Sequence, residues 1–413
     1  MTKIGRTIKY CCFGRVGKME KNIWKLNIDK SLLFFIGLMV FLYIVLVTTL
    51  LQYSYSGAIP IYYNVEKVLR LAIVVIGMYR TRYYTRREIA AIVLLIIVAG
   101  ASYLVIGSYT FFDVFFIAFF CRKINKEQVI NTFFYSILAG VIVATILYYM
   151  GIMPEFRIYR LETNQIRVAL GFSHPNVLAR LILILCALYI LKKKEKINLV
   201  DLIIMGAIGY WVYIYPNSIT SALVIYLLVV LLAISKIYEF LFQTDMVKNM
   251  FFKGAVLFLI PMTLIVVYVF LLNSSGESIL KDISSTFMGR FIYGMRAITT
   301  YGIHIFGTKL PIVGNASSYF SNRPSSYFVI DCLYIYMPVQ YGVIPSALFF
   351  IEYTRGIINC LRWKDFYMTS ILAVLALYSI SENGMALIYS SFIFIYSLSR
   401  DMKDEGFECL ESR

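Results

Sequence analysis

The chain has 413 residues, of which 60% are apolar and only 15% are charged, whereas an ordinary soluble protein is about half apolar and a quarter charged. This composition excludes a disordered chain, a collagen-like fibre and a disulfide scaffold, and it disfavours a soluble two-domain enzyme. The net charge of +16 is a common sign of nucleic-acid binding, but most basic residues stand in short clusters between apolar runs. The sequence therefore predicts a polytopic membrane protein without a nucleic-acid partner.

Apolar runs of about 20 residues, the length that crosses a bilayer, recur along the whole chain. We expect an all-α fold of about twelve transmembrane helices that form a single membrane domain, 31–399, between a basic segment, 1–30, and a tail, 400–413. The expected spans are 31–51, 60–79, 89–107, 109–121, 128–150, 174–191, 198–215, 219–235, 254–272, 326–352, 366–381 and 384–399.

The basic clusters predict the orientation, because short cytoplasmic loops carry the excess of lysine and arginine. With twelve spans, 28 of the 39 basic residues fall on one side, eight fall on the other, and Lys67, Arg70 and Arg180 lie inside spans. Both termini are thus expected in the cytoplasm. The run from Ser31 to Leu51 is too long for a signal peptide and reads as a membrane anchor.

Two outer loops are long enough to carry a site, 151–173 and 273–325. They contain three basic against two acidic residues and five basic against two, although outer loops are normally poor in arginine. Arginine binds phosphate through a planar fork, so the loops indicate an anionic ligand. The sequence has no phosphate-binding glycine motif and no zinc spacing, and we expect neither a cofactor nor a metal.

Within the second loop, residues 287–304 form an amphipathic helical pattern that suits the outer membrane surface. Its polar face gathers Arg290, Tyr293, Arg296, Thr300 and His304. A merely solvated face explains Arg296 as well as a function does, whereas a functional role is favoured for Arg290.

The sixth span opens with His174-Pro175-Asn176, and on local chemistry His174 or Asn176 is best interpreted as a helix cap. Asn176 and Arg180 are four residues apart and share a helix face. Arg180 should lie about 9 Å below His174 at the helical rise per residue, where a cation needs a partner or a wet cavity.

Other ionisable residues inside the spans have different expected roles. Glu66 and Arg70 are spaced as a structural ion pair, and the role of Asp113 stays open. Asp331, at the outer end of the tenth span, is the best candidate for a general base.

Several of these motifs occur together in a known family. Arg167 followed by Gly171-Phe-Ser-His174-Pro175-Asn176 and a hydrophobic helix resembles the bacterial O-antigen polymerases (Wzy type), which group with the O-antigen ligases. The large loop with Gly289-Arg290 and Leu310-Pro311-Ile-Val-Gly314 is similar to that family. So is Asp331-Cys-Leu-Tyr334 followed by Gln340-Tyr-Gly342. The chain departs from it at 217–221, where a Ser-Arg pair is absent, and at Asp331, where ligases have histidine.

The resemblance implies a GT-C-like, metal-independent glycosyltransferase in the bacterial cytoplasmic membrane, with its active site facing outside. It would polymerise undecaprenyl-pyrophosphate-linked oligosaccharide repeats into capsular, exo- or O-antigen polysaccharide, with a flippase and a chain-length regulator as possible partners besides membrane lipid. Under this hypothesis Arg290 and Arg167, with Arg157 or Arg160 and Arg296, bind the pyrophosphate. Asp331, or His174 as second choice, accepts the proton, and Asn176, Arg180 and Tyr293 support the site.

Two other classes fit part of the pattern. A lipid-linked oligosaccharide flippase or other transporter also suits twelve spans, but its two halves should match, and the 273–325 loop has no counterpart in the first half. A ligase that transfers finished glycan to another acceptor shares nearly all of the features.

Overall fold

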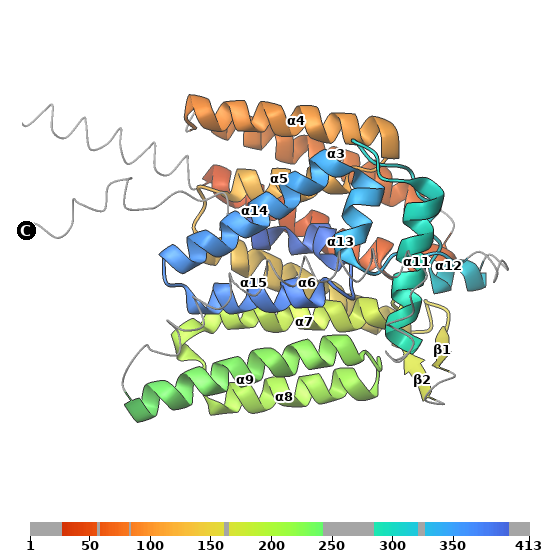
Figure 1. Cartoon of the computed structure of the whole chain (residues 1–413), viewed down its shortest axis with the longest axis vertical. Helices are drawn as coiled ribbons and strands as arrows, with labels where there is room; N and C mark the ends of the chain where they lie inside the picture. Colours follow the sequence, from red (N-terminus) through yellow and green to blue (C-terminus); the bar gives the residue numbers. More distant parts are fainter. Residues whose placement is uncertain are drawn as a thin grey trace, which may run out of the picture.

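The computed structural model describes residues 27–55, 58–81, 84–160, 165–242, 285–320 and 327–395. The expected ninth span, 254–272, and the expected terminal segments lie outside these residues, apart from the start of the first helix. The described part is mostly helical, and its long helices lie side by side (Figure 1).

The first half of the chain forms a series of helices whose ends match the expected spans closely. The first helix runs Asn27–Val47 and ends in a π-helical turn, η1 (Tyr43–Val47). The elements that follow are α2 (Leu51–Ser54), α3 (Ala58–Arg80), α4 (Arg86–Ile106), α5 (Thr110–Cys121), α6 (Lys126–Tyr149), α7 (Pro175–Lys193), the short 3-10 turn η3 (Lys194–Lys196), α8 (Leu199–Ile214) and α9 (Ile219–Phe242).

Side-chain caps explain where several of these helices begin. Thr85 and Glu88 form a reciprocal capping box at the start of α4, and Asn198 and Asp201 form another at the start of α8. Asn125 caps α6 with its side-chain oxygen alone, which accepts from the backbone N–H of Glu127. Each cap satisfies backbone N–H groups that have no partner within the helix.

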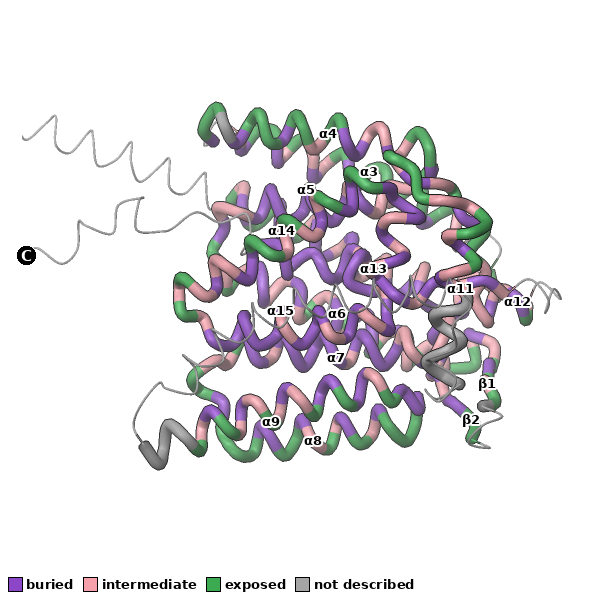
Figure 2. The backbone as a smooth tube through the Cα atoms, in the orientation of Figure 1, coloured by how far each residue is buried: buried purple, intermediate pink, exposed green. Residues whose placement is uncertain are grey.

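The distribution of apolar side chains is that of a membrane protein. Among the described helices, five are long and apolar enough to cross a bilayer, and three shorter ones are strongly apolar. The inner helix α7 is buried along most of its length, whereas the outer helices α4 and α8 are largely exposed (Figure 2). Their exposed residues are large and apolar, for example Leu104 at 84% and Leu199 at 71%. A bilayer is the solvent that suits such a surface. Twelve spans and the orientation stay predictions.

The loop 151–173 contains a β-hairpin that an all-α fold does not include. Strands β1 (Arg157–Arg160) and β2 (Gln165–Val168) are antiparallel, with Ile158 opposite Arg167. The hairpin lies with α11 (Ser285–Tyr301) and α12 (Asn315–Phe320) at one end of the helices (Figure 1). We call this the hairpin end.

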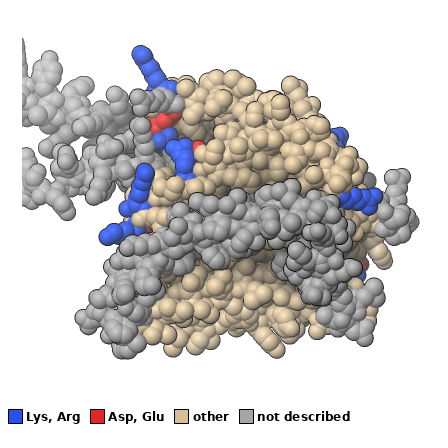
Figure 3. All heavy atoms as spheres, in the orientation of Figure 1, with Lys and Arg blue, Asp and Glu red and all other residues tan. Residues whose placement is uncertain are grey.

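Lysine and arginine side chains gather at the opposite end, where α6 begins and α7 finishes. Figure 3 shows most of the visible blue atoms there, with fewer at the hairpin end. Lys192 and Lys193 occupy the last turn of α7, and Arg122 and Lys123 both contact Glu88. We call this the lysine-rich end.

The expected tenth span, 326–352, is not one helix. Residues 329–332 have no regular secondary structure. After them, α13 (Leu333–Tyr336) leads into a π-helical turn, η5 (Met337–Tyr341), and α14 (Val343–Arg362) begins as a separate helix. The break falls at Gly342, whose φ of 94° is open to glycine and strained for other residues. The sequence pattern missed this break because apolar residues continue through it.

The last two expected spans also differ from regular membrane helices. α15 (Phe366–Tyr378) ends at Ser379, and the chain continues in two 3-10 segments, η6 (Gly384–Ala386) and η7 (Ile388–Phe394). Both 3-10 segments are buried, so this part of the chain lies inside the bundle. It is here that the main polar network forms.

Candidate functional site

The start of α7 carries the helix cap that the sequence predicts. His174 is extended, with φ of −156°, and its Nδ1 accepts a hydrogen bond of 3.0 Å from the backbone N–H of Asn176. Pro175 occupies the first helical turn, where its missing N–H costs nothing. Because Nδ1 accepts, a neutral His174 must carry its proton on Nε2. The capped imidazole therefore presents a donor at its other nitrogen.

Arg167 projects from β2 onto the same helix end. Its Nε donates to the backbone oxygen of Pro216 at 3.0 Å, and its guanidinium also hydrogen-bonds the side-chain oxygen of Asn176. The strand itself is held by Val168, whose N–H donates to the oxygen of Tyr215 at 3.0 Å. The turn between α8 and α9 thus sets the position of Arg167, which is buried.

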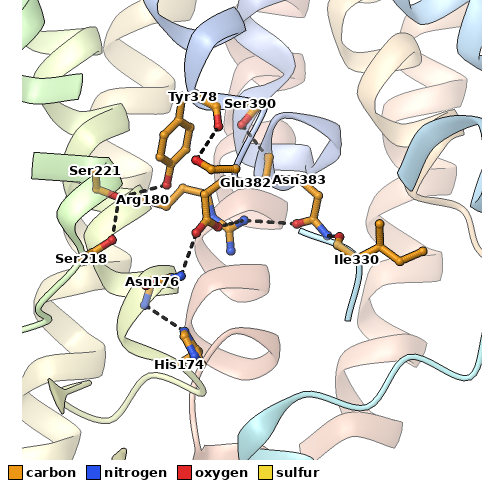
Figure 4. A network of polar contacts seen from close by, with 12 residues as sticks. His174, Asn176, Arg180, Ser218, Ser221, Ile330, Tyr378, Glu382, Asn383 and Ser390 are labelled. Carbon is orange, nitrogen blue, oxygen red and sulfur yellow. Dashed lines mark hydrogen bonds and ion pairs between the residues drawn. The ribbon is translucent and has the colours of Figure 1, made fainter. Parts of the chain in front are cut away.

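Arg180 lies one helical turn after Asn176 on α7, and its partners, Glu382 and Asn383, come from a segment about 200 residues later in the chain. Its Nη1 lies 3.7 Å from Oε2 of Glu382 and 3.4 Å from Oδ1 of Asn383 (Figure 4). Oε1 of the same glutamate accepts a hydrogen bond of 2.7 Å from Nδ2 of Asn176. Arg167, Asn176, Glu382 and Arg180 therefore form one continuous chain of polar contacts.

The guanidinium of Arg180 is buried, and not all of its N–H donors have a hydrogen-bond partner among the described residues. The residue is only 6% exposed, and its Nε has no hydrogen-bond partner among the residues that the structure describes. Both acceptors of Nη1 are at long distances. A buried charge is stable only when it is paired and hydrogen-bonded, so Arg180 retains donor capacity for an anionic group.

Hydroxyl groups extend the network along α9 and α15. Ser218 donates to Ser221 at 3.1 Å, and Ser221 lies 3.0 Å from the hydroxyl of Tyr378 (Figure 4). On the other side, Nδ2 of Asn383 donates to the backbone oxygen of Ile330 at 2.8 Å. This bond ties the segment that contains Asp331 to the Arg180 region.

A second buried ion cluster joins α3 to α5. Arg70 forms a fork with both carboxylate oxygens of Asp113, at 2.7 and 2.9 Å, and also binds Glu66 at 2.7 Å. The guanidinium lies 4.0 Å from the centre of the Tyr109 ring. The predicted Glu66–Arg70 pair is confirmed, and Asp113, whose role the sequence leaves open, is a second partner of Arg70.

The structure brings together four of the predicted site residues, namely Arg167, His174, Asn176 and Arg180. Asp331 is half-buried and follows Ile330, which contacts Asn383. Arg157 is exposed at 59% of its side chain and pairs with Glu155, so it lies outside the network. Arg160 lies on β1 and Arg290 on α11, but their side chains lie outside the described residues.

The described half of α11 packs against protein. Ala297 is fully buried, and Tyr293 contacts the rings of Tyr327 and Phe328. Tyr293 is thus a packing residue, although the helical wheel placed it on the polar face. Arg296 is exposed, as expected for a solvated position.

Sequence reasoning missed Glu382 and Asn383. They stand in Ser381-Glu-Asn-Gly384 between two apolar runs. The glutamate alone could have indicated a site, because a charged residue between two membrane segments is costly and is usually functional or paired.

No family model, no curated protein and no solved structure matches this chain. The resemblance to the O-antigen polymerases thus stands on the motifs of the sequence. Chemically, the network offers two buried guanidinium groups at the hairpin end, with a carboxylate between them. Such a set can bind an anion and accept or relay a proton.

Proposed function

We propose that this protein is a glycosyltransferase that polymerises undecaprenyl-pyrophosphate-linked oligosaccharide repeats at the outer face of the bacterial cytoplasmic membrane. Its donor is the growing glycan on the lipid pyrophosphate, and its acceptor is a single lipid-linked repeat. The hairpin end is the outer end in this proposal, because the lysine-rich end carries the cytoplasmic clusters.

The observation that carries the proposal is the pair of buried arginines joined through Asn176 and Glu382. Glycosyl transfer from a lipid pyrophosphate releases an anion, and guanidinium groups that are already in place stabilise the charge as it develops. Arg167 and Arg180 are held by the hairpin and by α7, with the Nε of Arg180 unengaged within the described part of the chain. Arg290 and Arg296 of α11 remain the proposed contacts from the large outer loop.

We propose that His174 is a helix cap and hydrogen-bond donor, although the sequence also offers it as second choice for the base. Its Nδ1 accepts from the backbone N–H of Asn176, so in the neutral imidazole the other nitrogen, Nε2, carries the proton and donates. Asp331 remains the proposed base, and Glu382 joins it as a second carboxylate next to the arginines. His174 serves as helix cap and as hydrogen-bond donor.

A lysine-for-arginine series tests the proposal. Lysine keeps the charge but lacks the planar fork, so Arg167→Lys and Arg180→Lys should each lower the rate of chain growth by about 100-fold, the scale of one lost transition-state donor. Arg355→Lys is the matched control, because Arg355 is 58% exposed, pairs with Glu352 and lies outside the network. The measurement is polymer length over time with purified protein and lipid-linked repeat in liposomes. Undiminished growth by both network variants would contradict the proposal.

Asp331→Asn and Glu382→Gln test the base. Each variant keeps the shape of its side chain and removes proton-accepting capacity, so the true base variant should stop chain growth and let single lipid-linked repeats accumulate. Activity that persists in both variants would exclude a carboxylate base at either position.

The Arg70 cluster is an observation that favours a transporter, since ion clusters buried inside membrane proteins often mark transport pathways. The same reconstituted system separates the classes. A flippase moves the lipid-linked repeat across the bilayer without chain growth. A ligase leaves it unchanged until a second acceptor is added.

A further inference from the structure

A groove lies between the first helix and α6, in the half of the molecule towards the lysine-rich end. Its volume is about 630 Å³. One wall is formed by Lys30, Leu33, Phe34, Gly37, Leu38 and Phe41, and the other by Gln128, Asn131, Thr132, Tyr135, Ser136 and Ala139. Both sets recur at three- and four-residue steps, so each wall is one continuous helix face.

The length of the groove matches one leaflet of a bilayer. Each wall spans twelve residues, and the eleven helical steps between its ends cover roughly 16 Å. Half of a typical hydrocarbon core is about 15 Å. The groove therefore runs from the membrane interface at the lysine-rich end to about the midplane.

Polarity changes along the groove in one direction. The interface end presents Lys30, Gln128 and Asn131, whereas the deep end presents Leu38, Phe41 and Ala139. Between them Gly37 lets the two helices approach closely, because a Cβ at this position would lie 2.7 Å from Oγ of Ser136 and 3.1 Å from Cγ2 of Thr132. The groove thus has a charged end, then amide side chains, then an apolar end. This order matches the headgroup, the polar backbone region and the acyl chain of a phospholipid.

Two groups at the interface end are not satisfied within the described part of the protein. Lys30 is exposed and has no ion pair there, and its neighbour Asp29 is occupied by Arg80 at 2.8 Å. Oδ1 of Asn131 is buried and has no hydrogen-bond partner among the described residues. The exposed ammonium of Lys30 thus suits a negative charge, and Asn131 offers an unused acceptor beside it.

We propose that this groove binds one anionic glycerophospholipid whose headgroup carries hydroxyls, such as phosphatidylglycerol. The phosphate pairs with Lys30, a headgroup hydroxyl donates to Asn131, and one acyl chain follows Gly37 to Phe41 and Ala139. A membrane helix from a second copy is the alternative occupant, and it would appear as a protein dimer. The proposal is independent of the glycosyltransferase activity.

The test is native mass spectrometry of the full chain released from nanodiscs of equal parts phosphatidylglycerol and phosphatidylcholine. The wild-type protein should retain one phosphatidylglycerol in preference to phosphatidylcholine. Lys30→Ala should reduce this preference about fivefold, since one lysine near an anionic lipid contributes roughly 1 kcal/mol. Ala139→Phe fills the deep end and should abolish retention of the lipid.

Two matched variants control for charge and size. Lys196→Ala removes an exposed lysine at the same end, and Ala91→Phe enlarges an exposed alanine on α4; neither residue lines the groove. Both should retain the lipid as the wild type does, and size-exclusion chromatography checks that every variant is folded. Equal retention of the two lipids by the wild type would overturn the proposal. So would unchanged retention by both groove variants, or a protein dimer in place of bound lipid.

Discussion

Arg180 depends on the absence of a side chain at Gly384. A Cβ built on Gly384 would overlap Cδ and Nη1 of Arg180 and lie 2.5 Å from its Nε. The glycine therefore lets η6 approach the guanidinium closely, and the polar network rests on this contact as much as on Glu382.

Gly384→Ala should destabilise the protein and displace Arg180. Overpacking a dense interior typically costs about 1–3 kcal/mol, so the midpoint of thermal unfolding in detergent should fall and the rate of chain growth should fall with it. Gly100→Ala is the control, because a Cβ there meets nothing within 4 Å. A Gly384→Ala variant as stable and active as this control would show that the contact is unimportant.

The Arg180–Glu382 pair should be more sensitive to the loss of one partner than to the loss of both. Glu382→Met leaves a buried guanidinium without its carboxylate, which costs about 3–5 kcal/mol, whereas a well-packed apolar replacement of both partners is often neutral. We expect Arg180→Met/Glu382→Met to unfold at a higher denaturant concentration than Glu382→Met. The opposite order would mean that the two residues are not energetically coupled.

Residues near one another in the chain were predictable, and distant ones were not. Asn176 and Arg180 are four residues apart and share one helix face, and His174 caps the same helix, so the proximity of these three residues follows from local geometry. Glu382 lies 206 residues from Asn176, and no local pattern says which helices pack together. The need of Arg180 for a partner was predictable from its depth in the membrane, but the identity of the partner was not.

At the scale of elements, the β-hairpin depends on the turn between α8 and α9. Asn217 in that turn has a φ of 48°, and its side-chain amide donates to Gln165 of β2. Asparagine tolerates this left-handed conformation, which is strained for β-branched residues. The hairpin and the turn therefore form one structural unit that carries Arg167.

Replacing Asn217 separates backbone strain from the loss of its hydrogen bond. Asn217→Gly keeps the left-handed conformation and loses only the amide bond, whereas Asn217→Val loses both. We expect faster proteolysis within 157–168 in both variants, and clearly more in Asn217→Val. Equal, wild-type proteolysis rates in the two variants would show that the turn does not hold the hairpin.

Gln165-Ile-Arg167-Val alternates polar and apolar residues, which is a strand pattern. Four residues are too few to predict a strand between long helical runs. The split at Gly342 and the 3-10 segments after α15 have no comparable signal in the sequence. They follow from packing inside the bundle, where apolar composition carries no information about the type of helix.

At the scale of the whole molecule, the orientation of the chain is a prediction that labelling can test. Glu155 and Glu195 are exposed glutamates at the hairpin end and the lysine-rich end. In intact cells, a membrane-impermeant thiol reagent should label Glu155→Cys but label Glu195→Cys only after lysis. The parent chain and control carries serine at Cys11, Cys12 and Cys409, which lie outside the described residues, and its other four cysteines, Cys121, Cys186, Cys332 and Cys360, are all buried. The reverse labelling pattern would invert the topology.

The crossing of the backbone at Gly307 and Gly342 has a consequence for mutational scanning. Both residues have positive φ, 83° and 94°. A Cβ on Gly307 would lie 2.6 Å from the carbonyl carbon of Tyr341, and one on Gly342 would lie 2.6 Å from that of Phe306. The N–H of Thr308 donates to Gln340 across this crossing at 3.2 Å, and that of Val343 donates to His304 at 3.0 Å.

Neither glycine can be exchanged alone, because backbone faces backbone at both positions. A scan that measures only polymer production would therefore score Gly342, which lies in a family-like motif, as if it were part of the chemistry. A parallel measurement of protein abundance would separate the two causes. Intolerance at Gly307 and Gly342 should appear as lost protein, whereas intolerance to Arg180→Lys should appear in protein that is still present.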